Sequence, residues 1–494
     1  MRQDTTPLER NRVRVRYADM STHSSSKPVI VWFRRDLRTT DHAALHAAAE
    51  TGKPVIALFI READHSYPMG AASDWFLHYC LKALDEALSV PLVVREGTSQ
   101  EVIGDIIPAT GADEVHWGRR YQKDAIERDA ALKEALNAQG ITVETHNTLL
   151  LSEPWEIKTG GGTPYRVFTP YFRKFREQVD VGEPLPAPNL KHYAGNVESL
   201  TVEELGLLPI ITPSGHDWGK KLEPYWTPGP EGARERLQEF LDKAVGYYAE
   251  YRDRPDYDRT SRLSPFLAHG CISARECWHA NNAAEVGSDK FLSELGWREF
   301  SYVLLYHNPE MKTQPLNPQS KAFQWEGTQE QLEAWQRGMT GYPIVDAGMR
   351  QLWDMGWQHN RVRMITASFL IKDLLVEWQK GEEWFWDCLC GGDPANNSQG
   401  WQWVAGCGAD ASPFFRIFNP ISQGERYDPQ GEYVKRWCPE LKDLPKKWIH
   451  RPWEAPDHVL DDAGVTLGTD YPVPMVDHAK ARDRALELYK EMRA

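Results

Sequence analysis

The sequence predicts an N-terminal α/β domain, with a parallel sheet of the Rossmann or flavodoxin type, followed by a large all-α C-terminal domain. Two observations lead to this prediction. Up to about residue 150, short apolar runs alternate with helix-patterned segments, an order typical of parallel sheets with right-handed crossovers. From about residue 228 the strand signals fade and amphipathic helical patterns replace them.

Five apolar runs are expected to form the sheet, with helices between them at residues 74–88 and 123–138. The runs are Pro28–Phe33, Val55–Ile60, Pro91–Val94, Glu114–Trp117 and Ile141–Val143. No G-x-G-x-x-G motif follows the first run, so the usual dinucleotide fingerprint is absent. Arginines follow it instead, and we expect plain surface charges rather than site residues at Arg34, Arg35 and Arg38.

The pattern divides the chain into four regions. Residues 1–27, with Thr/Ser runs and little apolar pattern, are expected to be a disordered extension. Residues 28–150 form the α/β domain. The Pro- and Gly-rich residues 151–227 form a connector that wraps the surface. Residues 228–494 form the helical domain, with helices expected at residues 231–251, 328–338, 344–354 and 365–380.

Composition is that of an ordinary globular protein of 494 residues, with 41% hydrophobic and 26% charged residues. Mean hydropathy is -0.57, and no apolar run approaches the roughly 18 residues that span a membrane. The net charge of -14 argues against a basic coat but leaves room for a local basic patch. Seven scattered cysteines favour reduced thiols and a cytoplasmic location. Their spacing fits no zinc pattern, and no metal is expected.

Twenty tryptophans are the unusual feature of the composition. They are compatible with a packed helical core, with stacking on nucleic-acid bases, or with electron relay to a redox cofactor. Composition alone does not choose among these three roles.

Three segments of the helical domain carry unusual polar and aromatic patterns. Residues 260–265 place three hydroxyls and one arginine before a helix, which suits phosphate binding and, equally, an N-cap and turn. Glu294, Trp297 and Arg298 share one helical face. An aromatic ring beside amide and guanidinium groups suits a flat heterocyclic ligand, although core helices with paired arginines show the same pattern. A second such face contains Trp357, Asn360, Arg361 and Met364.

Six motifs follow one another in order along the chain beyond residue 27, within a match that continues to about Arg482. They are Trp32–Arg38, Thr260–Pro265, Glu294–Phe300, His359–Met364, Asn396–Trp403 and Phe414–Pro420. At these motifs the sequence resembles the cryptochrome/photolyase family, and most nearly its bacterial enzymes that act on cyclobutane pyrimidine dimers. The resemblance implies a light-driven carbon–carbon lyase that uses FAD to split these dimers in UV-damaged DNA. The alternative is a cryptochrome-type blue-light photoreceptor.

The resemblance also implies roles for residues at matching positions. FAD contacts are implied for Tyr248, Thr260, Ser261, Arg262, Leu263, Ser264, Arg298, Asn360, Arg363 and Asn397. Contacts to the flipped-out dimer are implied for Glu294, Trp297, Asn360, Arg361, Met364 and Trp403. An electron relay is implied through Trp401, Trp378 and Trp325. Within these sets Glu294, Asn360, Met364, Asn397 and the relay are the candidate catalytic groups. Arg416 and Arg426 are added as candidate DNA contacts.

Two departures from the family pattern stand out. Relatives place an Asp opposite the arginine at Arg363, whereas this chain has Gly391 there, and we expect Asp393 to compensate. The stretch after Trp117 lacks the Asn-Glu pair of some folate-binding relatives. The sequence therefore leaves open whether an antenna pigment binds and, if one does, whether it is methenyltetrahydrofolate, a deazaflavin or another flavin.

Other features favour repair by a monomer that has no membrane association. No long tail follows the family match, and Asn397 stands where plant-type cryptochromes tend to have Asp. A diffusible-substrate oxidoreductase would need a nicotinamide site, and the sequence shows no sign of one. Asn360 and Met364 replace two histidines of animal-type (6-4) enzymes, so cyclobutane dimers are the expected lesion, with His359 structural.

Overall fold

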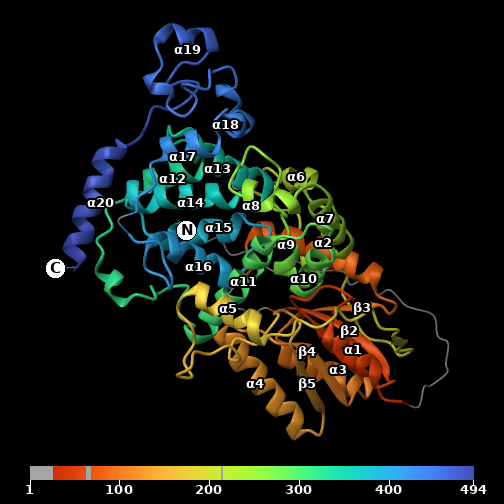
Figure 1. The fold of residues 1–494 in the computed structure, drawn as a ribbon. Helices are drawn as coiled ribbons and strands as arrows, with labels where there is room; N and C mark the ends of the chain where they lie inside the picture. Colours follow the sequence, from red (N-terminus) through yellow and green to blue (C-terminus); the bar gives the residue numbers. More distant parts are fainter. Residues whose placement is uncertain (1–25, 63–67, 213–214, 415, 494) are drawn as a thin grey trace, which may run out of the picture.

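The computed structural model describes residues 26–62, 68–212, 215–414 and 416–493. The extension expected at residues 1–27 therefore lies almost wholly outside the described residues. Figure 1 shows the α/β part at the bottom right, the helical part above it, and the connector, mostly yellow, between them. The expected fold class is confirmed.

The N-terminal sheet is parallel, with strand order β3-β2-β1-β4-β5, which matches five of the six strands of the Rossmann order 3-2-1-4-5-6. Its strands are β1 Val29–Phe33, β2 Pro54–Glu62, β3 Leu92–Gly97, β4 Glu114–Gly118 and β5 Thr142–His146. All five expected strands are thus present. A two-residue strand from the connector, β6 Lys191–His192, pairs with β2.

Helices cover both faces of this sheet, which is why β1 is buried throughout. They are α1 Ala43–Glu50, α2 Ala71–Ala87, α3 Ser99–Thr110 and α4 Lys123–Ala138. Alternate residues of β1 enter different cores. Val31 packs with residues of α1 and α2, whereas Trp32 packs with residues of α3 and α4. The α1–α2 core continues into the helical domain.

The three arginines after β1 are not the surface charges that we expected. Only 6% of Arg34 and 1% of Arg38 is exposed. Arg38 Nη1 donates to the carbonyl oxygen of Gly270 at 3.1 Å, and Arg35 Nη1 donates to that of Ala268 at 3.4 Å. Because both acceptors lie in the helical domain, two of these guanidinium groups help to join the domains.

The connector is less irregular than its Pro and Gly content indicates. It contains the helix α5 Phe168–Gln178, which the sequence analysis did not predict. The helix buries Phe168, Tyr171 and Phe175 on one face and packs against α11 Asp289–His307. The pattern at i, i+3 and i+7 was visible in the sequence but was assigned to a linker.

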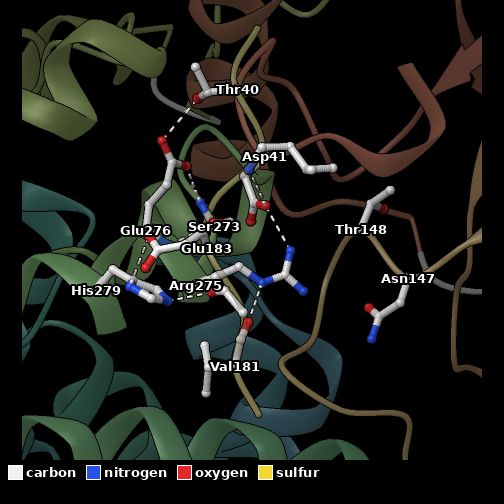
Figure 2. A network of polar contacts seen from close by, with 12 residues as sticks. Thr40, Asp41, Asn147, Thr148, Val181, Glu183, Ser273, Arg275, Glu276 and His279 are labelled. Atoms are coloured by element: carbon white, nitrogen blue, oxygen red, sulfur yellow. Dashed lines mark hydrogen bonds and ion pairs between the residues drawn. The ribbon is translucent and has the colours of Figure 1, made fainter. Parts of the chain in front are cut away.

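A polar network fixes residues 181–185 of the connector between the domains (Figure 2). Asp41 Oδ1 accepts hydrogen bonds from Arg275 Nη1 at 2.7 Å and from the Leu185 backbone N–H at 3.2 Å. Arg275 Nε donates to the carbonyl oxygen of Val181 at 2.7 Å. Arg275 lies on α10 Ala274–Ala283, so one guanidinium ties the α/β domain and the connector to the helical domain.

The helical domain supplies most of the remaining elements. Besides α10 and α11, the described helices are α6 Gly219–Leu222 at the end of the connector and, in the helical domain, α7 Pro230–Lys243, α8 Tyr248–Tyr251, α9 Ser264–His269, α12 Gln329–Gln336, α13 Pro343–Met355, α14 Asn360–Ser368, α15 Trp378–Cys388, α16 Pro394–Ala405, α17 Pro420–Tyr427, α18 Glu432–Trp437, α19 Asp457–Ala463 and α20 His478–Arg493. Within the described ranges, none of the helices is both long and apolar enough to cross a membrane.

Two of the four helices expected here are wrong in extent. The helix expected over residues 231–251 breaks after Lys243, where a 3-10 turn intervenes before α8. The helix expected over residues 365–380 is interrupted after a π-helical turn. Leu375 adopts a left-handed φ of 53°, and α15 starts only at Trp378. The first break contains Gly246, a signal that sequence reasoning overlooked, whereas no Gly or Pro marks the second.

Candidate functional site

Three packed helices bring the distant sequence motifs together. Glu294, Trp297 and Arg298 lie on α11, residues 360–364 begin α14, and residues 397–403 lie on α16. Helix α16 packs against both α11 and α14. The segments singled out in the sequence therefore converge on one region of the helical domain.

The hydroxyl-rich segment at residues 260–264 leads into α9, whose first residue is Ser264, but its hydroxyls do not cap that helix. The N-cap position is Leu263, and no side chain bonds to the helix N-terminus. Arg236 instead shapes the segment, donating to the carbonyl oxygens of Ser261 at 2.9 Å and Thr260 at 3.1 Å. The interpretation as a simple capping turn is thereby weakened, and Arg236 is a contributor that sequence reasoning missed.

Arg262 in this segment is held in an unfavourable conformation. Its φ of 52° lies in the left-handed region, which side chains rarely adopt and which often marks functional sites. Its Nη2 lies 2.9 Å from Asp258 Oδ1, and its guanidinium carbon lies 5.4 Å from the ring centre of Trp357. The buried Nε has no hydrogen-bond partner, so Arg262 retains a donor for another group.

Arg363 on α14 has no carboxylate partner among the residues the structure describes. Its Nη2 donates to Asn397 Oδ1 at 2.6 Å, and its guanidinium carbon lies 5.1 Å from the ring centre of Phe385. Desolvation lowers the pKa of Arg363 to about 10, opposed by the more distant Glu382 carboxylate. A desolvated cation with only an amide partner favours an anionic or polar group beside it.

The expectation that Asp393 compensates Arg363 is wrong. Asp393 caps α16, accepting from the Asn396 backbone N–H at 2.8 Å, and accepts a 2.5 Å hydrogen bond from the Tyr302 hydroxyl. A Cβ at Gly391 would lie 2.6 Å from the Cα atom of Pro265, so no side chain fits there. The close approach of two backbones thus explains why this position lacks a carboxylate.

Ion pairs hold Glu294 and Arg361. Glu294 is paired with Arg252 and with Lys290, the latter at 3.1 Å. Arg361 Nη2 lies 2.6 Å from Asp253 Oδ2. Arg252 and Asp253 were not singled out in the sequence because no motif marks them, and only the fold places them beside α11 and α14. They hold both expected dimer contacts in position.

Trp297 presents a supported aromatic plane. It stacks on Phe168 of α5 with ring centres 3.9 Å apart and an interplanar angle of 12°. Trp297 and Trp403 are both partly buried, as is Met364, whereas Asn360 is exposed at the start of α14. The connector helix therefore backs one of the two tryptophans expected to receive a flat substrate.

Two other expected FAD contacts are occupied by protein interactions. Arg298 is buried, with Nη1 3.0 Å from Glu299 Oε1. Burial raises the pKa of Glu299 to about 7, while Arg298 and the backbone N–H groups of Leu151 and Ser152 oppose that rise. Tyr248 is buried edge-on against Phe240, and burial raises the pKa of its hydroxyl. Arg298 is thus engaged by Glu299, and the Tyr248 ring by Phe240.

The three relay tryptophans differ in burial. Only 1% of Trp401 and 3% of Trp378 is exposed, whereas Trp325 is partly exposed. Trp401 packs against Phe385 at a ring-centre distance of 5.1 Å and against Trp335 at 6.2 Å. The order from buried to more exposed is the order that a relay toward the surface requires.

His359 has the structural role that we expected. It is the N-cap of α14, where its Nδ1 accepts from the Arg361 backbone N–H at 3.2 Å. Burial lowers its pKa to about 3, opposed by the Asp253 carboxylate. The imidazole is therefore neutral at physiological pH.

Acidification is expected to destabilise the protein through His359, and His359→Asn should reduce this effect. Between its unfolded pKa of about 6.5 and its folded pKa of about 3, the unfolded chain binds the extra proton. Stability is therefore lost as pH falls below about 6.5, by about 1.4 kcal/mol per pH unit for this group. Asn keeps the cap and does not titrate. Urea unfolding at pH 6.5 and 5 measures the difference; equal slopes in both proteins would contradict it.

The comparisons with known proteins agree with this geometry. The family model described as the FAD binding domain of DNA photolyase matches residues 291–491, and the model described as DNA photolyase matches residues 29–189. Together the two models span most of the α/β domain and most of the helical domain.

Relatives match over nearly the full length. A deoxyribodipyrimidine photo-lyase of Agrobacterium fabrum is 48% identical over 94% of this chain and 97% of its own. Cryptochrome-1 of Arabidopsis thaliana is 38% identical over 92% of this chain and 69% of its own. The crystal structure of a bacterial class III photolyase from Agrobacterium tumefaciens superposes with a TM-score of 0.92 at 47% identity, covering 96% of this chain and 100% of that one. An archaeal photolyase from Sulfolobus tokodaii, solved with two FAD molecules, covers 94% and 100% at a TM-score of 0.79 and 30% identity.

Proposed function

This chain belongs to the cryptochrome/photolyase family, and we propose that it is a deoxyribodipyrimidine photo-lyase that splits cyclobutane pyrimidine dimers in DNA. It is an enzyme of the lyase class. The observation that carries the assignment is the convergence of the three motifs on α11, α14 and α16 in a chain that is 48% identical to a photo-lyase but 38% identical to a cryptochrome. Asn397, at the centre of that convergence, favours repair over signalling.

The residues of the helical domain fit FAD. Arg363 lacks a carboxylate partner in the described chain, and the buried Nε of Arg262 lacks any partner, so both can accommodate an anionic group. We assign residues 260–264 to the phosphates and ribityl chain, and Arg363 and Asn397 to the flavin. When bound and reduced, FAD supplies the light-driven electron that opens the cyclobutane ring. The electron returns to the flavin afterwards.

The protein residues position the substrate. A dimer inside a duplex is out of reach, so it must leave the base stack, and a damaged pair costs less to unstack. Trp297, backed by Phe168, offers one stacking plane, and Trp403 offers a second. Glu294, held by Arg252, accepts hydrogen bonds from the pyrimidine N–H groups.

Exposed arginines beside α17 are proposed to bind DNA phosphates. Arg416 and Arg426 are exposed, and the guanidinium of Arg426 lies 5.2 Å from the ring centre of Tyr427. Arg361, in contrast, is occupied by Asp253 and packs over Tyr427 at 4.5 Å. Arg361 is therefore better suited to positioning the pocket than to binding a phosphate.

Removing one phosphate contact should reduce the salt dependence of DNA binding. We expect Arg426→Gln to reduce the slope of log affinity against log salt by about 0.9, because one fewer counterion is released. Fluorescence anisotropy with dimer-containing duplex at several salt concentrations measures this slope. The control is Lys82→Gln, an exposed cation on α2 in the α/β domain. An unchanged slope for Arg426→Gln, or an equal change for Lys82→Gln, would remove Arg426 from the interface.

One assay tests the proposed function directly. Purified reduced protein is illuminated with an oligonucleotide that contains a thymine dimer, and the restored thymine is quantified by chromatography. Repair in light, with none in the dark, is expected. Flavin photoreduction with no restored thymine would overturn the assignment in favour of a cryptochrome-type photoreceptor.

We propose further that the enzyme works as a monomer in the cytoplasm and carries a second, antenna chromophore. The seven cysteines are free and buried, in keeping with a reducing compartment. The antenna, a folate, a deazaflavin or another flavin, is proposed because the Sulfolobus photolyase structure contains two FAD molecules. Chromatography of the extracted pigments identifies the chromophore, and light scattering gives the oligomeric state.

A further inference from the structure

A histidine pair with a neighbouring carboxylate lies on the β4–β5 edge of the sheet, in the α/β domain and apart from the site described above. The strands pair so that His116 of β4 stands opposite Glu144 of β5, with His146 two residues further along β5. Because side chains alternate between the faces of a strand, all three project from the same face. Their nitrogen and carboxylate ligand atoms lie within 4.8 Å of one another.

The distances suit a transition-metal ion. His116 Nδ1 and His146 Nε2 are 3.1 Å apart, and Glu144 Oε2 lies 4.0 Å from His146 Nε2. Two imidazole nitrogens bound to tetrahedral Zn²⁺ at 2.0–2.1 Å are separated by about 3.3 Å. The nitrogen pair is therefore already close to the spacing that a bound ion requires.

A further carboxylate orients the more buried histidine. His116 Nε2 lies 2.9 Å from Glu114 Oε1, and Glu114 Oε2 in turn accepts from Lys53 Nζ at 2.8 Å. A proton on Nε2 shared with this carboxylate leaves Nδ1 with a free lone pair toward His146. The carboxylate–histidine pair is the usual outer support of a histidine ligand.

We propose that His116, His146 and Glu144 bind one Zn²⁺ ion, with water in the fourth position. Only 1% of His116 is exposed, whereas Glu144 is exposed, so the ion would be reached from solvent past the carboxylate. Zn²⁺ replaces the hydrogen bond between the two imidazoles, and the His146 proton moves from Nε2 to Nδ1. The ion then links the edge strand β5 to β4. The sequence analysis expected no metal, but it weighed only the cysteines. His116 lies about thirty positions before Glu144 and His146, so no motif spacing marks the three residues.

Calorimetry with ZnCl₂ on the full-length holoprotein, after removal of metals by a chelator, tests the proposal. We expect one Zn²⁺ per chain, with at least about tenfold weaker binding in His146→Gln and in Glu144→Gln. Both positions are at least partly exposed, so neither substitution threatens the fold. The control is His46→Gln on α1, a partly exposed histidine paired with Glu50.

Cobalt gives a second readout that separates this site from the cysteines. Co²⁺ at a site of two histidines and one carboxylate gives visible d–d bands without thiolate charge-transfer bands, and the bands should be absent in His146→Gln. Absence of stoichiometric Zn²⁺ binding would overturn the proposal. So would unchanged Zn²⁺ affinity in both ligand variants, or thiolate bands in the cobalt spectrum.

Discussion

Trp401→Phe is expected to slow light-driven flavin reduction by an order of magnitude or more, while Trp335→Phe leaves it nearly unchanged. Trp401 is almost fully buried, and its indole N–H has no partner in the structure. In the proposed relay its electron passes to the flavin and is replaced through Trp378, then Trp325, and finally by an external reductant. Phenylalanine fills most of the same space but is far harder to oxidise, so the first step is lost.

Trp335 is the matched control for this experiment. It is fully buried, its ring centre lies 6.2 Å from that of Trp401, and its N–H donates to the carbonyl oxygen of Thr366 at 3.0 Å. Trp335→Phe therefore perturbs the same aromatic cluster as Trp401→Phe but removes no member of the proposed relay. The measurement is the absorbance of oxidised flavin under blue light with reductant, after FAD content and circular dichroism are matched. Equal slowing in both variants would assign Trp401 to packing alone.

The elements that sequence reasoning predicted are those that depend on local pattern. The central strands β1 and β2 are apolar runs that are buried over most of their length, and the helix at Lys123–Ala138 has the predicted ends. The errors have long-range causes. Burial of Arg38 depends on a carbonyl more than two hundred residues away, and the break at Leu375 depends on a left-handed turn that no Gly or Pro marks.

The candidate site shows the same division. Motif residues such as Glu294 and Arg363 could be selected from the sequence, but their partners could not. Arg252 pairs with Glu294 across more than forty residues, and Asn397 rather than Asp393 bonds Arg363. The match to the family indicates that Gly391 stands where relatives carry the Asp carboxylate. It does not indicate that the backbone of Pro265 fills the space beside Gly391.

The enzyme is expected to repair cyclobutane dimers and to leave (6-4) photoproducts unrepaired. Repair of a (6-4) lesion must move a proton to return a hydroxyl between bases, and histidine is the side chain suited to this near neutral pH. Asn360 and Met364 supply an amide and an apolar contact, neither of which transfers a proton readily. The neighbouring His359 does not take over this role, because it is buried as a helix cap and its pKa is lowered to about 3. Splitting a cyclobutane ring needs no such group, since the electron that breaks the two C–C bonds returns.

Matched oligonucleotides that carry one lesion each decide the question, with reduced enzyme under the same illumination. His359→Asn is the informative variant, because it keeps the cap of α14 and removes the only imidazole beside Asn360 in sequence. We expect it to repair the cyclobutane dimer at the rate of the unmodified enzyme, as a structural role requires. Efficient repair of the (6-4) lesion with the cyclobutane dimer untouched would reverse the assignment of substrate. Loss of cyclobutane repair in His359→Asn at pH 7, with FAD and fold retained, would instead place the histidine in the chemistry. Because these outcomes differ in the lesion affected, substrate choice and the role of His359 can be judged separately.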